Sequence, residues 1–382
     1  MPGTLYLGAE VFDGEGLAPG GLLVEDGHVA AVLRPEEPAR GAAVVDLGGG
    51  LVAPGFVDIQ VNGGGGVMFN DAPEVATLRR MADAHARLGT LTILPTLITD
   101  TPEVTRAAIA AVAQAVAEGL PGIAGLHLEG PHLSLARKGA HDPGLIRPMG
   151  GDDLRFLLDA ARSVPRLLLT IAPESVDKEQ ISALSDAGVI VSLGHTDAGF
   201  ATCRAAFDAG ARVATHLFNA MSPLGNREPG LVGAVLASGA VSAGIIADGI
   251  HVHPASLRVA LAAKAGPGSL FLVTDAMAPA GTDMRSFRLN GREIRRENGR
   301  LTLTDGTLAG ADLDMTRALR VITRDAGLAL DRALAMATSV PARVAGLGDR
   351  SGALAPGRQA DFVHLSDGLE LRGVWQRGVR LA

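Results

Sequence analysis

The sequence predicts an α/β protein, a (β/α)8 TIM barrel with a small β-sandwich domain formed from both ends of the chain. Three observations predict it. Eight short apolar runs recur between residues 56 and 275, and Ala- and Leu-rich stretches separate them. Polar or ionisable residues end these runs, and both chain ends alternate apolar and polar residues between turns. Near-continuous apolar runs are typical of parallel strands buried on both faces, and eight βα units close into a barrel.

The two chain ends are predicted to form one sandwich. At the N-terminal end, Asp26-Gly27 separates two alternating runs, which is a β-hairpin signal. Similar runs lie near the C-terminus, at residues 360–365 and 371–378. We therefore expect a β-sandwich domain from residues 1–53 and 346–382, and a barrel from residues 54–345.

The predicted barrel strands follow in order along the middle of the chain. They are residues 56–60, 91–96, 125–129, 167–174, 189–195, 212–216, 243–248 and 270–275. The helix after the second strand is the best marked, with Thr101 as its N-cap, Pro102 in its first turn and Gly119 as its stop signal.

Composition excludes several classes of function. The chain has 382 residues, 47% of them apolar, which is enough for a large core. A net charge of −7 and 3% aromatic residues argue against nucleic-acid binding. The single cysteine, Cys203, rules out an internal disulfide and a cysteine zinc cluster. We see no signal peptide or membrane span and expect a soluble, cytoplasmic protein that does not bind membranes.

Four strand-end residues carry the predicted chemistry. Glu129, His195, His216 and Asp275 close the third, fifth, sixth and eighth runs. One such histidine alone is more often a structural residue, but this edge of a barrel carries its active site. A carboxylate and two imidazoles are typical of a catalytic metal site with open positions for water. Asp275 is then the expected general base and acid.

Other polar residues keep two interpretations each. His127 lies on the same strand face as Glu129; it either supports the metal ligands from behind or packs in the core, and we favour packing. His141, on the loop after Glu129, either polarises a substrate carbonyl or is structural. His251 lies on the loop after the seventh run, where an imidazole can bind an anion or a metal ion. Arg227 lies in a long Gly- and Pro-rich loop and is either a phosphate ligand or a solvated surface residue.

These residues resemble the amidohydrolase superfamily and, within it, the N-acetylglucosamine-6-phosphate deacetylase family. Pro-Gly-Phe-Val-Asp at residues 54–58 is shared across the superfamily. More specific to the deacetylases are Leu-Glu-Gly-Pro at 128–131, His-Leu-Phe-Asn-Ala-Met at 216–221 and Asp-Gly-Ile-His at 248–251. The resemblance covers essentially the whole chain and implies the fold predicted above.

The resemblance also implies residue roles. Glu129, His195 and His216 would bind one divalent metal ion, Asp275 would be the acid and base, and His141 would polarise the acetyl carbonyl. The substrate would contact Ala140, His141, Asn219, Ala220, Arg227, Asp248, Gly249, Ile250, His251, Leu308, Ala309 and Gly310. Members of the family are dimers, which implies a homodimer with the phosphate site near its interface.

The sequence departs from the superfamily pattern at two places. Most members carry His-x-His at the end of the first strand, where this chain has Gln60-Val61-Asn62. Neutral amides are poor ligands for transition metals, so we expect a vacant second-metal position, as in the single-metal branch of the deacetylases. The second departure is Ala311-Asp312, where the family usually has serines.

The expected function is metal-dependent hydrolysis of N-acetylglucosamine 6-phosphate to glucosamine 6-phosphate and acetate, in amino-sugar catabolism or recycling. Zinc is the expected ion, with ferrous iron or another divalent ion as alternatives. One alternative is an amidohydrolase acting on N-acetylgalactosamine 6-phosphate or a cyclic amide. The other is a non-catalytic binding protein with the same fold, which the intact set of four strand-end residues disfavours.

Overall fold

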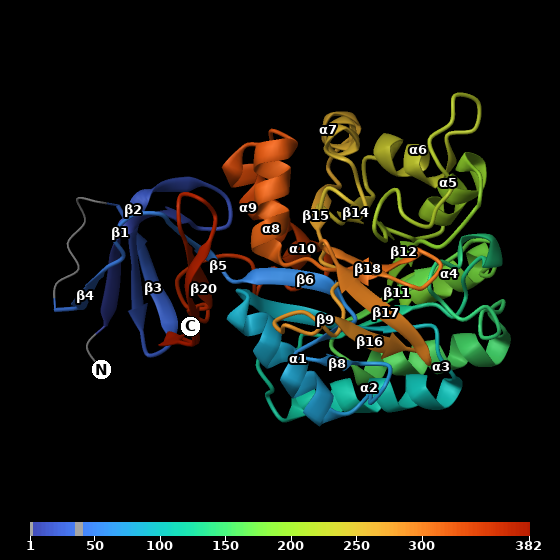
Figure 1. Cartoon of the computed structure of the whole chain (residues 1–382), viewed down its shortest axis with the longest axis horizontal. Helices are drawn as coiled ribbons and strands as arrows, with labels where there is room; N and C mark the ends of the chain where they lie inside the picture. The colour runs from blue at the N-terminus through green and yellow to red at the C-terminus, as the bar shows by residue number, and fades with distance from the viewer. Residues whose placement is uncertain (1–2, 35–40) are drawn as a thin grey trace.

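The computed structural model describes residues 3–34 and 41–382. Residues 1–2 and 35–40, part of the predicted N-terminal β region, lie outside the described residues. Eight parallel strands form the barrel in Figure 1, in the order β15-β14-β13-β12-β11-β10-β9-β6. They are β6 (Phe56–Val61), β9 (Thr90–Ile98), β10 (Leu126–Glu129), β11 (Leu167–Ile171), β12 (Ile190–Leu193), β13 (Val213–Ala214), β14 (Ser242–Ile245) and β15 (Leu270–Leu272). The prediction of eight parallel barrel strands is confirmed.

The barrel closes just beyond the ends of its first and last strands. The Asp275 amide donates to the Gln60 carbonyl at 3.0 Å, and the Asn62 amide donates to the Ala276 carbonyl at 2.8 Å. Val61 and Ala276 form a parallel β-bridge at the same level. This closure brings the first-strand amides next to the predicted general base.

Helices cover the barrel between successive strands. They are α1 (Val75–Arg87), α2 (Pro102–Ala117), α3 (Gly151–Ser163), α4 (Lys178–Asp186), α5 (Phe200–Asp208), α6 (Gly230–Ala237), α7 (Pro254–Ala263), α8 (Met315–Arg320), α9 (Leu330–Ala337) and α10 (Ser339–Val344). Short helical turns lie at η1 (Leu135–Arg137) and η2 (Val321–Asp325). The best-marked helix begins as predicted, because the Thr101 side chain accepts the Val104 amide. Gly119 follows its end with φ +70°.

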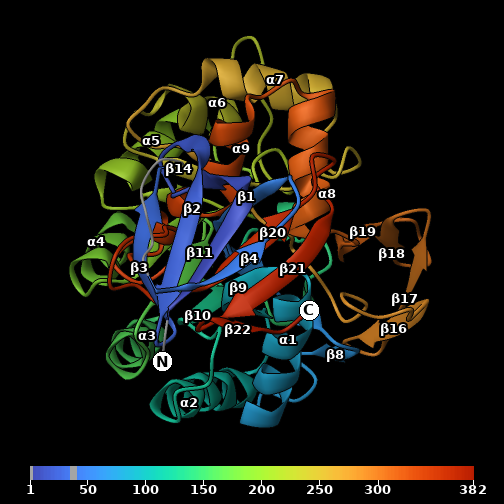
Figure 2. The same ribbon diagram turned by 90° about the vertical axis from the view of Figure 1, so that its left-hand side faces the viewer.

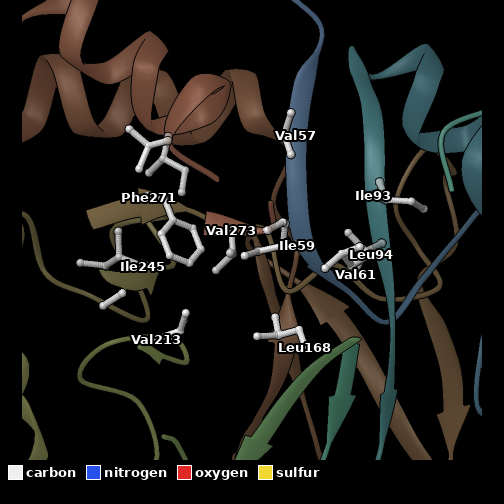
Figure 3. Close-up of a cluster of buried hydrophobic side chains, with 14 of the residues drawn as sticks. Val57, Ile59, Val61, Ile93, Leu94, Leu168, Val213, Ile245, Phe271 and Val273 are labelled. Atoms are coloured by element: carbon white, nitrogen blue, oxygen red, sulfur yellow. The ribbon is translucent and has the colours of Figure 1, made fainter. Parts of the chain in front are cut away.

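The barrel interior is packed with branched apolar side chains rather than open. Figure 3 shows Ile59, Leu168, Val213, Ile245 and Phe271 meeting from different strands. All five are buried. The barrel is therefore a solid core, and chemistry is confined to its ends.

A second sheet joins both ends of the chain (Figure 2). Its strands are β1 (Thr4–Phe12), β2 (Leu17–Glu25), β3 (His28–Leu33), β4 (Ala43–Asp46), β5 (Leu51–Pro54), β20 (Phe362–Leu365), β21 (Leu371–Gln376) and β22 (Val379–Arg380). β5 pairs antiparallel with β20, which links the two termini. Tyr6 packs edge-on against Phe362 and Trp375, with ring centroids 5.1 and 5.4 Å away. These contacts pack the two chain ends against each other in the predicted β domain.

The predicted hairpin forms at the expected turn. Asp26 and Gly27 join β2 to β3 with φ values of +47° and +76°. Two positive φ angles are typical of a type I′ turn, which matches the twist of antiparallel strands. The division into residues 1–53 with 346–382 and residues 54–345 stays a prediction, because sheet membership does not measure independent folding.

Sequence reasoning missed a small antiparallel sheet that follows the barrel. It consists of β16 (Ser286–Leu289), β17 (Arg292–Glu297), β18 (Arg300–Thr302) and β19 (Leu308–Ala311), and it projects at the right of Figure 2. A two-stranded ribbon, β7 (Gly63–Gly64) and β8 (Val67–Met68), follows the first barrel strand. Leu289, Ile294 and Leu301 of the small sheet pack in one cluster with Met68 and Met277.

Among the described residues, no helix combines the length and the apolar character needed to cross a membrane.

Candidate active site

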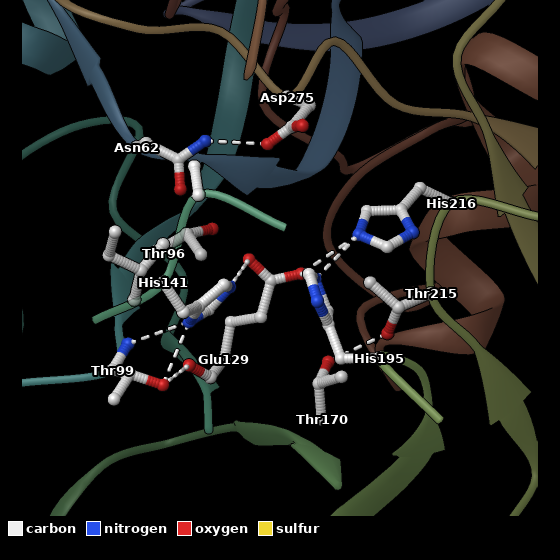
Figure 4. Close-up of polar contacts among 12 residues, drawn as sticks. Asn62, Thr96, Thr99, Glu129, His141, Thr170, His195, Thr215, His216 and Asp275 are labelled. Carbon is white, nitrogen blue, oxygen red and sulfur yellow. Dashed lines mark hydrogen bonds and ion pairs between the residues drawn. The ribbon is translucent and has the colours of Figure 1, made fainter. Parts of the chain in front are cut away.

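Four predicted site residues converge at the carboxyl end of the barrel strands (Figure 4). Glu129 Oε1 lies 3.4 Å from His195 Nε2 and 3.2 Å from His216 Nε2. The two imidazole Nε2 atoms are 3.1 Å apart. Asp275 lies across the opening, and all four side chains are buried. The structure therefore brings together residues from four different barrel strands.

This donor set fits a divalent metal ion. Glu129 Oε1 and the two Nε2 atoms are 3.1–3.4 Å from one another. Ligand atoms at the usual zinc bond lengths of about 2.0–2.2 Å are roughly 3.3–3.6 Å apart around a tetrahedral ion. His141 offers a further nitrogen, and the ligand atoms of Glu129, His141 and His195 lie within 4.8 Å of one another. The cluster therefore supports a divalent metal site.

The backbone at three of these residues adopts an uncommon conformation. His195, His216 and Asp275 have φ values of +47°, +31° and +51°. Positive φ is rare for residues other than glycine and occurs often at functional sites. Each of these residues lies two or three positions beyond the end of a barrel strand, so the left-handed turn directs its side chain into the opening.

Asp275 is held by the two first-strand amides. Asn62 Nδ2 donates to Asp275 Oδ1 at 2.6 Å, and Gln60 Nε2 donates to the same oxygen at 3.3 Å. Gln60 Nε2 also donates to Glu129 Oε1 at 3.2 Å. The amides at the predicted vacant second-metal position thus serve as hydrogen-bond donors to the carboxylates.

The surroundings shift the pKa values of Asp275 and Glu129 in opposite directions. Burial, followed by the charge of Glu129, raises the pKa of Asp275 to about 6. Burial alone would also raise the pKa of Glu129, but hydrogen bonds from His141, His195 and His216 hold that pKa well below its usual range. Glu129 is therefore the permanent anion, and Asp275 is the carboxylate that can exchange a proton near neutral pH.

His141 directs a ring nitrogen toward the same opening. Its Nε2 lies 3.5 Å from Glu129 Oε2. The Thr99 amide donates to His141 Nδ1 at 3.3 Å, so the proton of the neutral ring is assigned to Nε2. Burial, followed by the charge of His195, lowers the pKa of His141 to about 4. A neutral His141 thus presents an N–H donor to the site.

A cavity of about 380 Å³ opens above the cluster. Besides the cluster it is lined by the predicted residues Asn62, Ala140, Asn219, Ala220, His251, Leu308 and Gly310. It is also lined by residues that sequence reasoning missed, namely Ile98, Ala136, Arg137, Gly139, Ile246, Met277, Leu289 and Thr307. Leu289 lies on β16, Leu308 begins β19 and Thr307 directly precedes it, so the small sheet β16–β19 and its last turn form one wall of the cavity.

Arg137 was missed because it ends η1, a single short helical turn with no sequence signal. Its carbonyl accepts a hydrogen bond from His195 Nδ1 at 2.8 Å, and its guanidinium lies 2.7 Å from Asp197. A carbonyl in this place fixes the tautomer and the orientation of a ligating imidazole. Only the folded structure shows this contact.

Other predicted substrate residues lie around the cavity or outside its lining. His251 lines the cavity, and its Nδ1 is 2.6 Å from Asp248 Oδ2. Asp248 also accepts hydrogen bonds from the backbone amides of Ile250 and His251, so it holds this turn together. Asp248, Gly249 and Ile250 themselves do not line the cavity. Arg227 is exposed on the loop after β13 and does not line the cavity. Gln60 and Ala309 are buried and do not line the cavity either.

The chain is similar along its length to proteins of one family. The amidohydrolase family model matches residues 51–380. The N-acetylgalactosamine-6-phosphate deacetylase of Shewanella sp. (strain ANA-3) is 46% identical over 335 residues, which cover 87% of this chain and 83% of that protein. The N-acetylglucosamine-6-phosphate deacetylase of Haemophilus influenzae is 35% identical over 353 residues, which cover 92% and 91%.

A solved structure agrees with these matches. The crystal structure of the N-acetylglucosamine-6-phosphate deacetylase from Pasteurella multocida superposes with a TM-score of 0.94 at 33% identity, and all of both chains is covered. The fold and the family resemblance predicted from the sequence are thus confirmed. The chain belongs to the amidohydrolase family, and within it to the group that contains the N-acetylgalactosamine- and N-acetylglucosamine-6-phosphate deacetylases.

Proposed function

We propose that this protein hydrolyses the acetamide of N-acetylglucosamine 6-phosphate, releasing acetate and glucosamine 6-phosphate. The observation that carries this proposal is the convergence of Glu129, His195 and His216 opposite Asp275, in a chain related throughout its length to deacetylases of this kind. The alternative of a non-catalytic binding protein does not explain why acid, base and ligand side chains are all present and buried together.

Each residue of the site has a role in this reaction. Glu129, His195 and His216 would hold one divalent metal ion, which supplies Lewis-acid activation of water and of the acetyl carbonyl. Asp275 takes a proton from the attacking water and delivers it to the departing nitrogen. The Nε2–H of His141 donates to the oxygen on which negative charge develops. Zinc is the ion we propose, and ferrous iron is the alternative that the same ligands would accept.

The sugar phosphate would bind at the far side of the cavity. His251 presents its Nε2 there because Asp248 occupies its Nδ1, and the residues Asn219 and Ala220 lie beside it on the cavity wall. Arg227 is exposed outside the lining, so we propose that it completes the phosphate site across a homodimer interface. Because a charged phosphate ester does not cross a bilayer unaided, we place the reaction in the cytoplasm.

A second substrate has its own support. The Shewanella relative, at 46% identity, is named for N-acetylgalactosamine 6-phosphate. The two substrates differ only at the C4 hydroxyl, far from the amide that reacts. We therefore propose N-acetylgalactosamine 6-phosphate as the alternative substrate of the same machinery.

Acetate release tests both candidates. The zinc-loaded protein is incubated with each phosphorylated acetyl-sugar, with unphosphorylated N-acetylglucosamine and with a cyclic amide. We expect release only from the phosphorylated sugars, and their kcat/KM ratio identifies the physiological substrate. Hydrolysis of the cyclic amide alone would reassign the substrate class, and no hydrolysis with zinc or ferrous iron would favour the binding protein.

Three further measurements test the metal content, the phosphate site and the oligomeric state. Elemental analysis of protein purified without added metal should find one divalent ion per chain. Arg227→Ala should raise KM for the phosphorylated sugar at least 10-fold while kcat falls less, and light scattering should show a dimer. A monomer with an unchanged KM in the variant would contradict the shared phosphate site.

A further inference from the structure

A row of buried polar side chains crosses the barrel interior directly below the candidate metal ligands. It consists of Thr96, His127, Thr170, Thr215 and Ser192, and we call it the hydroxyl–imidazole belt. All five are buried, four of them with no exposed surface at all. They come from β9, β10, β11, the residue after β13, and β12. The reaction proposed above uses none of them.

His127 is the centre of the belt. The sequence favours core packing for it over a supporting role behind the metal ligands, and in the structure both of its ring nitrogens are hydrogen-bonded. Its Nδ1 lies 3.2 Å from Thr96 Oγ1, and its Nε2 lies 2.8 Å from Thr170 Oγ1. The imidazole thus bridges the strands on either side of the strand that carries Glu129.

The hydroxyl groups continue the belt in both directions. Thr170 Oγ1 lies 2.7 Å from Thr215 Oγ1, which lies 2.6 Å from Ser192 Oγ. At the other end, the Val61 amide donates to Thr96 Oγ1 at 2.9 Å. The hydrogen-bonded chain therefore runs from β6 to the residue after β13, across six neighbouring strands.

His127 needs a partner of each kind at its two ring nitrogens. A neutral imidazole donates at one ring nitrogen and accepts at the other, whichever tautomer is present. The Thr96 hydroxyl accepts the Val61 amide and also lies 3.4 Å from the Leu94 carbonyl, to which it can donate. A replacement for His127 must therefore both accept and donate to preserve the chain.

Every strand that supplies a metal ligand also supplies a belt residue. His127 precedes Glu129 by two residues, Ser192 precedes His195 by three, and Thr215 directly precedes His216. Thr170 is the strand partner of Glu129 in the parallel register. The belt therefore links the three strand ends that carry the ligands. The relative positions of these ends along the barrel axis set the spacing of the ligand atoms.

The free-energy cost of burying polar groups argues that the belt has a positioning role. Leu168 and Val213 precede Thr170 and Thr215 by two residues, so they share a strand face with them, and both are apolar and buried. Replacing both partners of a buried hydrogen bond by apolar groups of the same shape can be nearly neutral for stability. A belt of polar groups is therefore not needed to fill the barrel. Buried networks that are fully hydrogen-bonded instead select one arrangement of the elements they join.

We propose that His127 is a positioning residue for the metal site: through the belt it holds Glu129, His195 and His216 at the mutual spacing that binds the ion. The proposal rests on the metal site of the proposed function and not on the substrate. It predicts that a substitution that breaks the belt lowers the metal affinity of a protein that still folds.

The test measures metal affinity directly, by competition with a chelator for zinc. His127→Phe keeps the ring shape and removes both hydrogen bonds, and we expect zinc affinity to fall about 10–100-fold. The matched control is His364→Phe on β20, another buried strand histidine, whose Nε2 lies 2.8 Å from the Gly49 carbonyl. His364→Phe should lower the Tm without changing zinc affinity.

Two more variants keep the test decisive if His127→Phe does not fold. Thr170→Val removes the central hydroxyl and should weaken zinc binding in the same direction. His127→Gln, whose amide can still donate to Thr170, should recover part of the affinity. Wild-type affinity in His127→Phe or Thr170→Val, or an equal loss in His364→Phe, would overturn the proposal. If the wild-type protein itself does not bind zinc or ferrous iron, the proposed function fails as well.

Discussion

At the scale of single residues, Asp275 shows how this chain works with neutral amides in place of first-strand histidines. Two amide groups donate to one of its oxygens, at 2.6 and 3.3 Å, which leaves the other oxygen for proton transfer. Burial still raises the pKa of Asp275 to about 6. Hydrogen bonds thus orient the carboxylate, and burial separately raises its pKa.

The variant Asp275→Asn separates metal binding from proton transfer. The amide keeps the size of the side chain but cannot take a proton from water, so we expect kcat to fall by about 10²–10⁴. Zinc content should stay at the wild-type level, since Glu129, His195 and His216 are unchanged. An acetate-release assay measures kcat, and elemental analysis measures the zinc content. Wild-type turnover in this variant would refute the assigned role.

At the scale of elements, the small sheet β16–β19 is the feature that most changes the view of the site. It places Leu289, Thr307 and Leu308 on the cavity wall. Arg292 on β17 also donates to the carbonyl of Ala140, directly before His141. The sheet is therefore part of the binding site and not a peripheral insertion.

The variant Arg292→Ala tests this contact. A hydrogen bond from a charged group contributes about 1.5–3 kcal/mol, so removing it should lower kcat/KM at least 10-fold by loosening the loop that carries His141. Arg288→Ala is the matched control, because Arg288 is an exposed arginine on the neighbouring strand β16. Steady-state kinetics of both variants provide the measurement. Equal kinetics in the two variants would show that the sheet does not position the loop.

At the scale of the whole molecule, a buried carboxylate joins the first and last strands of the barrel. Asp58 on β6 accepts hydrogen bonds from the hydroxyl and the amide of Thr274, the latter at 3.2 Å. Burial raises the pKa of Asp58 to about 7, although hydrogen bonds from Thr274 and from the Gln60 amide lower it. The barrel seam therefore holds a group whose proton is retained up to near neutral pH.

This raised pKa predicts the sign of one pH effect on stability. Between about pH 4 and pH 7 the carboxyl is ionised in the unfolded chain and protonated in the fold, so its contribution to stability falls as pH rises. Asp58→Asn stays neutral at every pH. The wild-type Tm should therefore decline relative to Asp58→Asn between pH 5 and pH 8. A constant difference between the two Tm values would contradict the raised pKa.

Metal removal is expected to destabilise the whole barrel. Glu129, His195 and His216 follow or end different strands, so an ion bound to all three is bound only by the folded state. Zinc at about 1,000 times its Kd should add about 4 kcal/mol to the free energy of unfolding. Thermal unfolding with and without a chelator measures this. An unchanged Tm would mean that the three side chains do not share one ion.

The sequence by itself determined the barrel strands, the hairpin at Asp26-Gly27, the capped helix α2 and the four strand-end residues. These features depend on short-range patterns, because burial on both faces requires apolar runs and turns require particular backbone angles. Glu129, His195, His216 and Asp275 were recognisable because each one ends such a run.

Only the tertiary structure decided how distant segments meet. The closure of the barrel sets Asn62 beside Asp275, a loop carbonyl at Arg137 orients His195, and His127 joins hydroxyls from neighbouring strands. The small sheet β16–β19 closes the cavity from a segment with few sequence signals. These contacts depend on strand register and side-chain direction across the barrel, and no local sequence pattern specifies a partner tens to hundreds of residues away.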